Sequence, residues 1–189
     1  PNSILLAPSW NYNEKNFINE NFLWLTKVLL EKNFNVIFRP HPEHFKRSKT
    51  ILEKIKKNTV NKNFKYDEEP ENFNSMDNSK CLITDNSGIA IEYTLITKRP
   101  VLYLEDNEKL HNPERLDYKN LMNLEEDVKN NFGSKFKKDD IEKIDLLISK
   151  SIDHFKNRQF EVENFVNKNF YNYTKIDFFL KGNFDEIVK

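Results

Sequence analysis

Short apolar runs alternate with longer amphipathic segments along the first 105 residues, and this alternation constrains the fold more than any other feature. The runs have the length of buried strands, and the segments between them carry apolar residues at helical spacing. The expected strands are 3–7, 35–38, 64–66, 80–84 and 100–104, and the expected helices are 17–31, 45–57, 72–76 and 89–96. Strands that alternate with helices predict right-handed crossovers and a parallel sheet with helices on both faces.

After residue 105 the alternation ends, and the chain is predicted to be mainly helical, over 124–131, 139–155 and 158–170. The 189 residues, 38% of them hydrophobic, suffice for one α/β domain. We predict a Rossmann-like domain over 1–157 and a helical C-terminal extension over 158–189. Because the chain opens on Pro1 and enters a strand at once, we expect it to be part of a longer protein.

Composition argues against several classes of protein. The 30 basic and 30 acidic residues balance, whereas sequence-independent nucleic-acid binding normally needs a basic excess. No apolar run approaches the roughly 20 residues that cross a bilayer. A single cysteine, Cys81, forms neither a disulfide framework nor a thiolate zinc cluster, and we expect it to be inert core. The sequence has no P-loop and no GxGxxG turn, and we predict no metal and no cofactor.

Ligands of parallel α/β sheets bind outside the carboxyl ends of the strands. Four strand ends are chemically distinctive, at 8–11, 39–44, 85–88 and 105–107. In the third of these, Ser87 and Gly88 begin a helix, where backbone N–H groups and the helix dipole attract an anion. Glu92 lies one turn further on, where a carboxylate can accept hydrogen bonds from ribose. These features predict a nucleoside diphosphate site; the alternative is an ordinary helix cap with a solvated Glu92.

His41 stands between two prolines that stiffen its loop, so its imidazole can donate to a phosphate or act as an acid. The alternative is a structural turn, and we expect His44 on the surface. A metal site of His41, His44, Glu43 and Asp85 lacks a motif such as HExxH. A hydrolase triad of Ser87, His41 and Asp85 lacks the G-x-S-x-G elbow.

Aromatic residues recur near the C-terminus, where they indicate a membrane-surface face, helix packing, or a patch that another domain covers. They are Phe160, Phe165, Phe170, Tyr171, Tyr173, Phe178 and Phe179.

Four segments occur in an order that matches a known protein family: 4–10, 38–42, 82–88 with Glu92, and 99–103. Over residues 3–105 the chain resembles the C-terminal nucleotide-binding half of the CDP-glycerol glycerophosphotransferase family. Those bacterial transferases have the two-domain GT-B fold and build teichoic acids and related capsule polymers. The resemblance implies that His41 and the turn 85–88 contact the pyrophosphate of a CDP-linked donor, and that Ser9 and Trp10 border the same cleft.

The resemblance also implies that Glu92 reaches the ribose or other polar groups of the donor, that His41 acts in catalysis, and that no metal is needed. The donor site is therefore predicted to comprise Ser9, Trp10, Arg39, His41, Asp85, Asn86, Ser87, Gly88 and Glu92.

The turn Asn86-Ser87-Gly88 departs from the family, which usually has a Tyr-Ser-Ser or similar run after the aspartate. It is closer to the turn of GT-B sugar transferases and of UDP-N-acetylglucosamine 2-epimerase relatives. The donor is therefore CDP-linked or a UDP-sugar, and a non-catalytic assembly domain is the third reading. The expected partners are this donor and a missing N-terminal GT-B domain. We expect a cytoplasmic protein, with peripheral contact at the inner face of the membrane as an open option.

Overall fold

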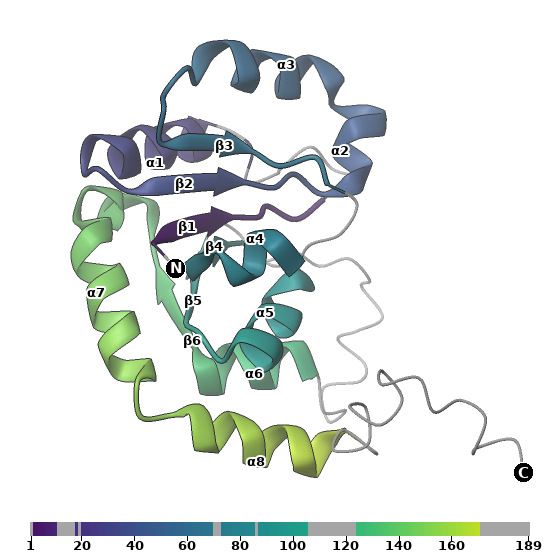
Figure 1. The fold of residues 1–189 in the computed structure, drawn as a ribbon, viewed down its shortest axis with the longest axis vertical. Helices are drawn as coiled ribbons and strands as arrows, with labels where there is room; N and C mark the ends of the chain where they lie inside the picture. The colour runs from purple at the N-terminus through teal and green to yellow at the C-terminus, as the bar shows by residue number, and fades with distance from the viewer. Residues whose placement is uncertain are drawn as a thin grey trace, which may run out of the picture.

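Among the residues that the structure describes, six strands form a wholly parallel central sheet, with strand order β3-β2-β1-β4-β5-β6 (Figure 1). The computed structural model describes residues 2–10, 18, 20–69, 73–85, 87–105 and 124–170. The strands are β1 (Ser3–Leu6), β2 (Asn35–Phe38), β3 (Phe64–Tyr66), β4 (Ser79–Thr84), β5 (Val101–Leu104) and β6 (Gly133–Phe136). The order 3-2-1-4-5-6 is that of the doubly wound Rossmann fold, so the predicted fold class is confirmed.

The helices follow the predicted order. They are α1 (Glu20–Glu31), α2 (Pro42–Arg47), α3 (Lys49–Asn58), α4 (Phe73–Asp77), α5 (Ile89–Thr97), α6 (Leu124–Phe132), the 3-10 helix η2 (Lys138–Lys143), α7 (Ile144–Phe155) and α8 (Gln159–Asn169). Two predictions needed correction. The helix expected over 45–57 is two helices, because Ser48 leaves the helical region with φ −128° and ψ 32°. The helix expected over 139–155 begins with the 3-10 turn η2.

β6 was missed by the prediction that the chain after residue 105 is mainly helical. It pairs in parallel with β5, with Val101 opposite Gly133 and Leu104 opposite Phe136. In the sequence Gly-Ser-Lys-Phe only Phe136 becomes buried. An edge strand of this kind lacks the apolar run by which buried strands are detected, so only the pairing with β5 defines it.

Two apolar layers cover the faces of the sheet, and the strands supply alternate residues to each. Ile4 and Leu6 face a core shared with α1, α3 and α7, in which the Phe22 ring packs at a tilt against Phe38 with ring centroids 4.6 Å apart. Leu5 faces the opposite layer, which α4 and α5 cover (Figure 1). Alternate residues of each buried strand therefore belong to two separate apolar cores, one on each face of the sheet.

The C-terminal helix α8 packs on the same body rather than standing apart from it. Val162 and Val166 share an apolar cluster with residues of α5, α6 and α7, and the Phe165 ring lies edge-on to Phe132 at 5.4 Å. Phe160 is exposed. The domain boundary predicted at residue 157 stays a prediction, and the aromatic positions from Tyr171 onward lie outside the described residues. Within the described part of the chain, no helix combines the length and apolarity of a membrane span.

Hydrogen bonds after α1 and after α5 hold the ends of neighbouring elements in place. Asn33 ends α1 in the left-handed region with φ 60°, and the amide of Phe34 donates back to the Leu29 carbonyl. After α5, Arg99 donates from Nη1 to three carbonyls, those of Met76, Asp77 and Ser79. The Arg99-Pro100 segment of the family resemblance therefore braces the amino end of β4, away from the carboxyl edge where ligands bind.

Candidate functional site

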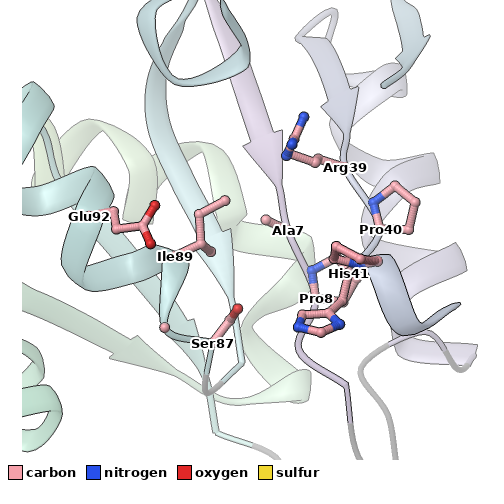
Figure 2. Close-up of a pocket in the computed structure, with 10 residues that line it drawn as sticks. Ala7, Pro8, Arg39, Pro40, His41, Ser87, Ile89 and Glu92 are labelled. Atoms are coloured by element: carbon pink, nitrogen blue, oxygen red, sulfur yellow. The ribbon is translucent and has the colours of Figure 1, made fainter. Parts of the chain in front are cut away.

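β1 and β4 lie side by side in the sheet, but their crossovers run to opposite sides, which makes their carboxyl ends the topological switch point. A pocket of about 390 Å³ lies there. Its walls come from three segments that the sequence singled out: those following β1, β2 and β4. Figure 2 shows Arg39 and His41 on the β2 side, Ser87 and Glu92 on the α5 side, and Pro8 between them.

The start of α5 supplies one wall of this pocket. Gly88 is the N-cap with φ −55° and ψ −26°, and no side-chain hydrogen bond caps the helix among the described residues. The amides of Ala90 and Ile91 donate to the carbonyls of Ser87 and Gly88 at 3.0 Å. Ser87 therefore does not act as the conventional helix cap that was the alternative reading. Asn86, also predicted to be in the site, lies outside the described residues.

His41 forms the opposite wall and is the N-cap of α2. Its Nδ1 accepts a hydrogen bond from the amide of Glu43 at 3.2 Å. A nitrogen that accepts from an amide carries no hydrogen, so the neutral ring has its N–H at Nε2. The cap thus fixes both the orientation and the tautomer of His41, and Nε2–H is the donor suited to an anionic oxygen in the pocket.

Ser9 and Asp85 lie close together, as predicted, but chiefly as partners of each other. The amide and the hydroxyl of Ser9 each donate to one oxygen of the Asp85 carboxylate, both at 2.8 Å. Both residues are buried, and neither lines the pocket, nor does Trp10. Thr84 adds a further link, since its hydroxyl donates to the Ala7 carbonyl at 2.6 Å. These contacts join the β1 loop to the β4 turn and set the distance between these two segments at the switch point. Direct donor binding by Ser9, Trp10 and Asp85 stays a prediction.

His44 was expected on the surface, and this expectation was wrong. The side chain is buried, with Nε2 3.3 Å from the Ser9 carbonyl and Nδ1 3.4 Å from the Ser48 hydroxyl. Its ring meets Trp10 edge-on at 5.0 Å. The amphipathic pattern of such a short helix does not reveal this burial, because the β1 loop that covers His44 is distant in sequence. His44 anchors α2, and therefore His41, to that loop.

Arg39 lines the pocket, and sequence reasoning missed what holds it. Its Nη1 donates to Oδ2 of Asp67 at 2.8 Å, in an ion pair whose side chains are 12% and 1% exposed. Oδ2 also accepts from the Ser75 hydroxyl, and Oδ1 accepts from the amide of Glu69 at 3.0 Å. Burial acts to raise the pKa of Asp67, but the bonds from Ser75, Arg39 and Glu69 outweigh it and hold that pKa below its ordinary value. Asp67 directly follows β3, so a search of every strand end would have found it.

The remaining predictions concern Glu92, metals and Cys81. Glu92 is exposed and lines the pocket from α5, one turn beyond Gly88, as expected. Among the described residues, no group of three or more His, Cys, Asp or Glu side chains is placed to hold a metal ion. Burial raises the pKa of the Cys81 thiol, which keeps it protonated in the core.

Two solved structures illustrate the similarity of this chain to known proteins. The wall teichoic acid polymerase TagF is 22% identical, with a TM-score of 0.49 over 100% of this chain and 44% of that one. The UDP-GlcNAc 2-epimerase of Methanocaldococcus jannaschii, in complex with UDP-GlcNAc and UDP, is 21% identical, with a TM-score of 0.48 over 77% of this chain and 38% of that one. The chain thus spans less than half the length of either.

No curated protein sequence matches the chain. The profile of one family, described as CDP-Glycerol:Poly(glycerophosphate) glycerophosphotransferase, matches residues 2–174, most of the sequence, and the chain therefore belongs to this family.

Proposed function

We propose that this chain is the donor-binding domain of a GT-B transferase that moves a glycerophosphate group from a CDP-linked donor to a growing surface polymer. The observation that carries the proposal is the pocket at the switch point, where the start of α5 faces the oriented imidazole of His41. Membership of the glycerophosphotransferase family supports the same reading.

The pocket suits a diphosphate for electrostatic reasons. The positive end of the α5 dipole, the Ser87 hydroxyl and Nε2–H of His41 are all donors or positive partial charges. Glu92 lies on the same wall as Ser87, where its carboxylate would accept hydrogen bonds from the ribose hydroxyls. Diphosphate and ribose recognition side by side describe a nucleoside diphosphate.

The proposed reaction is displacement at phosphorus. An acceptor hydroxyl oxygen bonds to the phosphorus that carries glycerol, and the bond from this phosphorus to the bridging oxygen breaks. CMP departs with that electron pair, while the hydroxyl proton passes to a general base that we assign to the other half of the enzyme. His41, Ser87 and the positive end of the α5 dipole would stabilise the charge that grows on the departing phosphate. This chain alone is therefore expected to bind donor, not to turn it over.

A nucleotide titration of the isolated chain tests the proposal. CDP and CMP should shift the backbone resonances of residues 87–92, and Ser87→Ala and His41→Ala should each weaken CDP binding by about tenfold, the effect of one hydrogen bond to a charged group. Ser134→Ala, a serine substitution in β6, is the control and should leave the affinity unchanged. Absence of binding to any pyrimidine nucleotide at millimolar concentration would count decisively against the proposal.

The donor base is the second question for the same titration. The turn Asn86-Ser87-Gly88 favours a UDP-sugar as the alternative donor, because it differs from the usual family run at this position. Tighter binding of UDP than of CDP would support that alternative. Failure to bind either nucleotide, together with concentration-dependent self-association, would support a non-catalytic assembly domain.

The whole protein is proposed to contain a second, N-terminal GT-B domain that closes over this pocket and supplies the acceptor contacts. A cytoplasmic location, with peripheral contact at the inner face of the membrane, follows from polymer synthesis on nucleotide-linked precursors. Co-expression of the chain with the preceding segment of its parent protein, followed by a transfer assay, would test this arrangement.

A further inference from the structure

The Arg39–Asp67–Ser75 cluster lies at the edge of the pocket, and neither Asp67 nor Ser75 has an assigned role. Arg39 directly follows β2 and Asp67 directly follows β3, and the last residues of these strands, Phe38 and Tyr66, are paired in register. The amide of Asp67 donates to the Phe38 carbonyl at 2.8 Å, so the sheet pairing continues one residue beyond the strands. The backbone thus delivers the guanidinium and the carboxylate to the same place.

The carboxylate of Asp67 is more extensively bonded than a simple ion pair requires. Arg39 and Ser75 both donate to Oδ2, and the amide of Glu69 donates to Oδ1. Asp67 and Ser75 are each 2% exposed. Both oxygens are therefore fixed by groups from the segments after β2 and β3 and from α4, and Asp67 is a rigid anchor rather than a mobile surface acid.

A pair of this kind contributes little to net stability, because the desolvation of both charges offsets their attraction. Its geometric effect is larger. A guanidinium is a planar fork of five N–H donors, and an acid that holds one donor restricts the direction of the whole group. Arg39 lines the pocket, so what Asp67 restricts is the cation that an anionic ligand meets.

We infer that Asp67, supported by Ser75, is a positioning residue that holds the Arg39 guanidinium in place for the phosphates of the ligand. This inference rests on the proposed function, since it assumes that the pocket takes a phosphorylated ligand. Positioning of Arg39 by Asp67 and partial neutralisation of Arg39 by Asp67 predict opposite effects on anion affinity. If Asp67 only diluted the positive charge of Arg39, its neutralisation would strengthen anion binding, whereas loss of positioning weakens it.

The substitution Asp67→Asn separates these effects, because an amide cannot accept the bonds from Arg39 and Ser75 on one oxygen and that from Glu69 on the other. We expect binding of CDP and of inorganic pyrophosphate, measured by calorimetry, to weaken by about tenfold. Ser75→Ala removes one bond and leaves the carboxylate, so it should fold readily and weaken binding by a smaller factor. Asp153→Asn on α7, an exposed change of the same charge, is the matched control and should bind as the wild type.

A double-mutant cycle with Arg39→Ala distinguishes positioning of Arg39 from a general structural role of Asp67. If Asp67 acts through Arg39, Asp67→Asn has no further effect on affinity in the Arg39→Ala background. In the ligand-free chain, the side-chain N–H resonances of Arg39 should indicate slow guanidinium rotation that Asp67→Asn abolishes and Asp153→Asn preserves.

The outcomes separate the inference from the proposed function. Wild-type chain that binds neither CDP nor pyrophosphate overturns the proposed function, and with it the positioning of Arg39 for a ligand. If the wild-type chain binds both ligands, the inference alone is overturned by either of two results. One is that Asp67→Asn binds as tightly as the wild type or more tightly. The other is that Asp67→Asn weakens binding by the same factor in the Arg39→Ala background as in the wild type.

Discussion

The substitution Gly88→Ala separates ligand binding at the start of α5 from the stability of the fold. Gly88 has φ −55° and ψ −26°, which any residue adopts, and a Cβ added there meets nothing within 4 Å. Two small effects then oppose each other. Alanine restricts the unfolded chain, which stabilises the protein by about 0.4–1 kcal/mol. It is also a poorer N-cap than glycine, by roughly 0.5 kcal/mol.

The net change in the free energy of unfolding should therefore stay within about 0.5 kcal/mol, a shift in Tm of under about 2 °C for a chain of this size. Binding should respond far more. Gly88 lines the pocket, so the added methyl group would hold a phosphate away from the backbone at the start of α5. Loss of one hydrogen bond to a charged group costs about 1.5–3 kcal/mol. CDP affinity should fall tenfold or more.

Gly133→Ala is the matched control, because the same substitution meets a different environment there. Its Cβ would lie 2.4 Å from Cε2 of Tyr103 and 2.6 Å from the Lys129 carbonyl oxygen. We expect overpacking to destabilise the protein by about 1–3 kcal/mol, while the folded fraction binds CDP normally. Calorimetric titration and thermal unfolding of both variants give the comparison. Unchanged CDP affinity in Gly88→Ala, or a loss of Tm equal to that of Gly133→Ala, would refute the reasoning.

Three further predictions concern the supports of the pocket and the core. Ser9→Ala removes the hydrogen bond from the Ser9 hydroxyl to the buried Asp85 carboxylate and should cost about 1–3 kcal/mol in chemical denaturation; a smaller cost would mean that another donor replaces this bond. Folding lowers the pKa of Asp67 below its value of 3.8 in the unfolded chain. The ionised carboxylate therefore contributes its full stabilisation at pH values well above 3.8, and this stabilisation is lost as the pH falls through the lower pKa of the folded state. The stability difference between wild type and Asp67→Asn should therefore shrink as the pH falls from about 5, and a constant difference down to about pH 2 would contradict this pKa direction. Phe22→Ala should cost about 3–5 kcal/mol by leaving a cavity against Phe38, and a cost below about 1 kcal/mol, measured by denaturation, would show that the α1 layer repacks.

Much of the pocket was predictable because of one property of parallel sheets. Their strands all end at the same edge, so residues that follow different strands meet there whatever their separation in sequence. Ser87, Gly88, Glu92, His41 and Arg39 line one pocket for this reason. The family resemblance, found on residues 3–105, is confirmed by a match that extends over 2–174.

The roles within the pocket were less predictable, because they depend on which polar groups pair. Donor contact by Asp85 stays a prediction, but the two hydrogen bonds that its oxygens accept from Ser9 were not predicted. His44 was expected at the surface but is covered by the β1 loop. Pairing of this kind is decided by distances of a few tenths of an ångström, which spacing along a chain does not encode.

By itself, the sequence determined the alternation of strands and helices and the polar composition of the strand ends. Local periodicity carries that information, because burial on one face imposes a repeat of 2 or 3.6 residues. Only the tertiary structure decided the strand order, the sixth strand at the sheet edge, and the Arg39–Asp67 pair. Each of these joins segments distant in sequence, and their energies arise from contacts that exist only once the chain has folded.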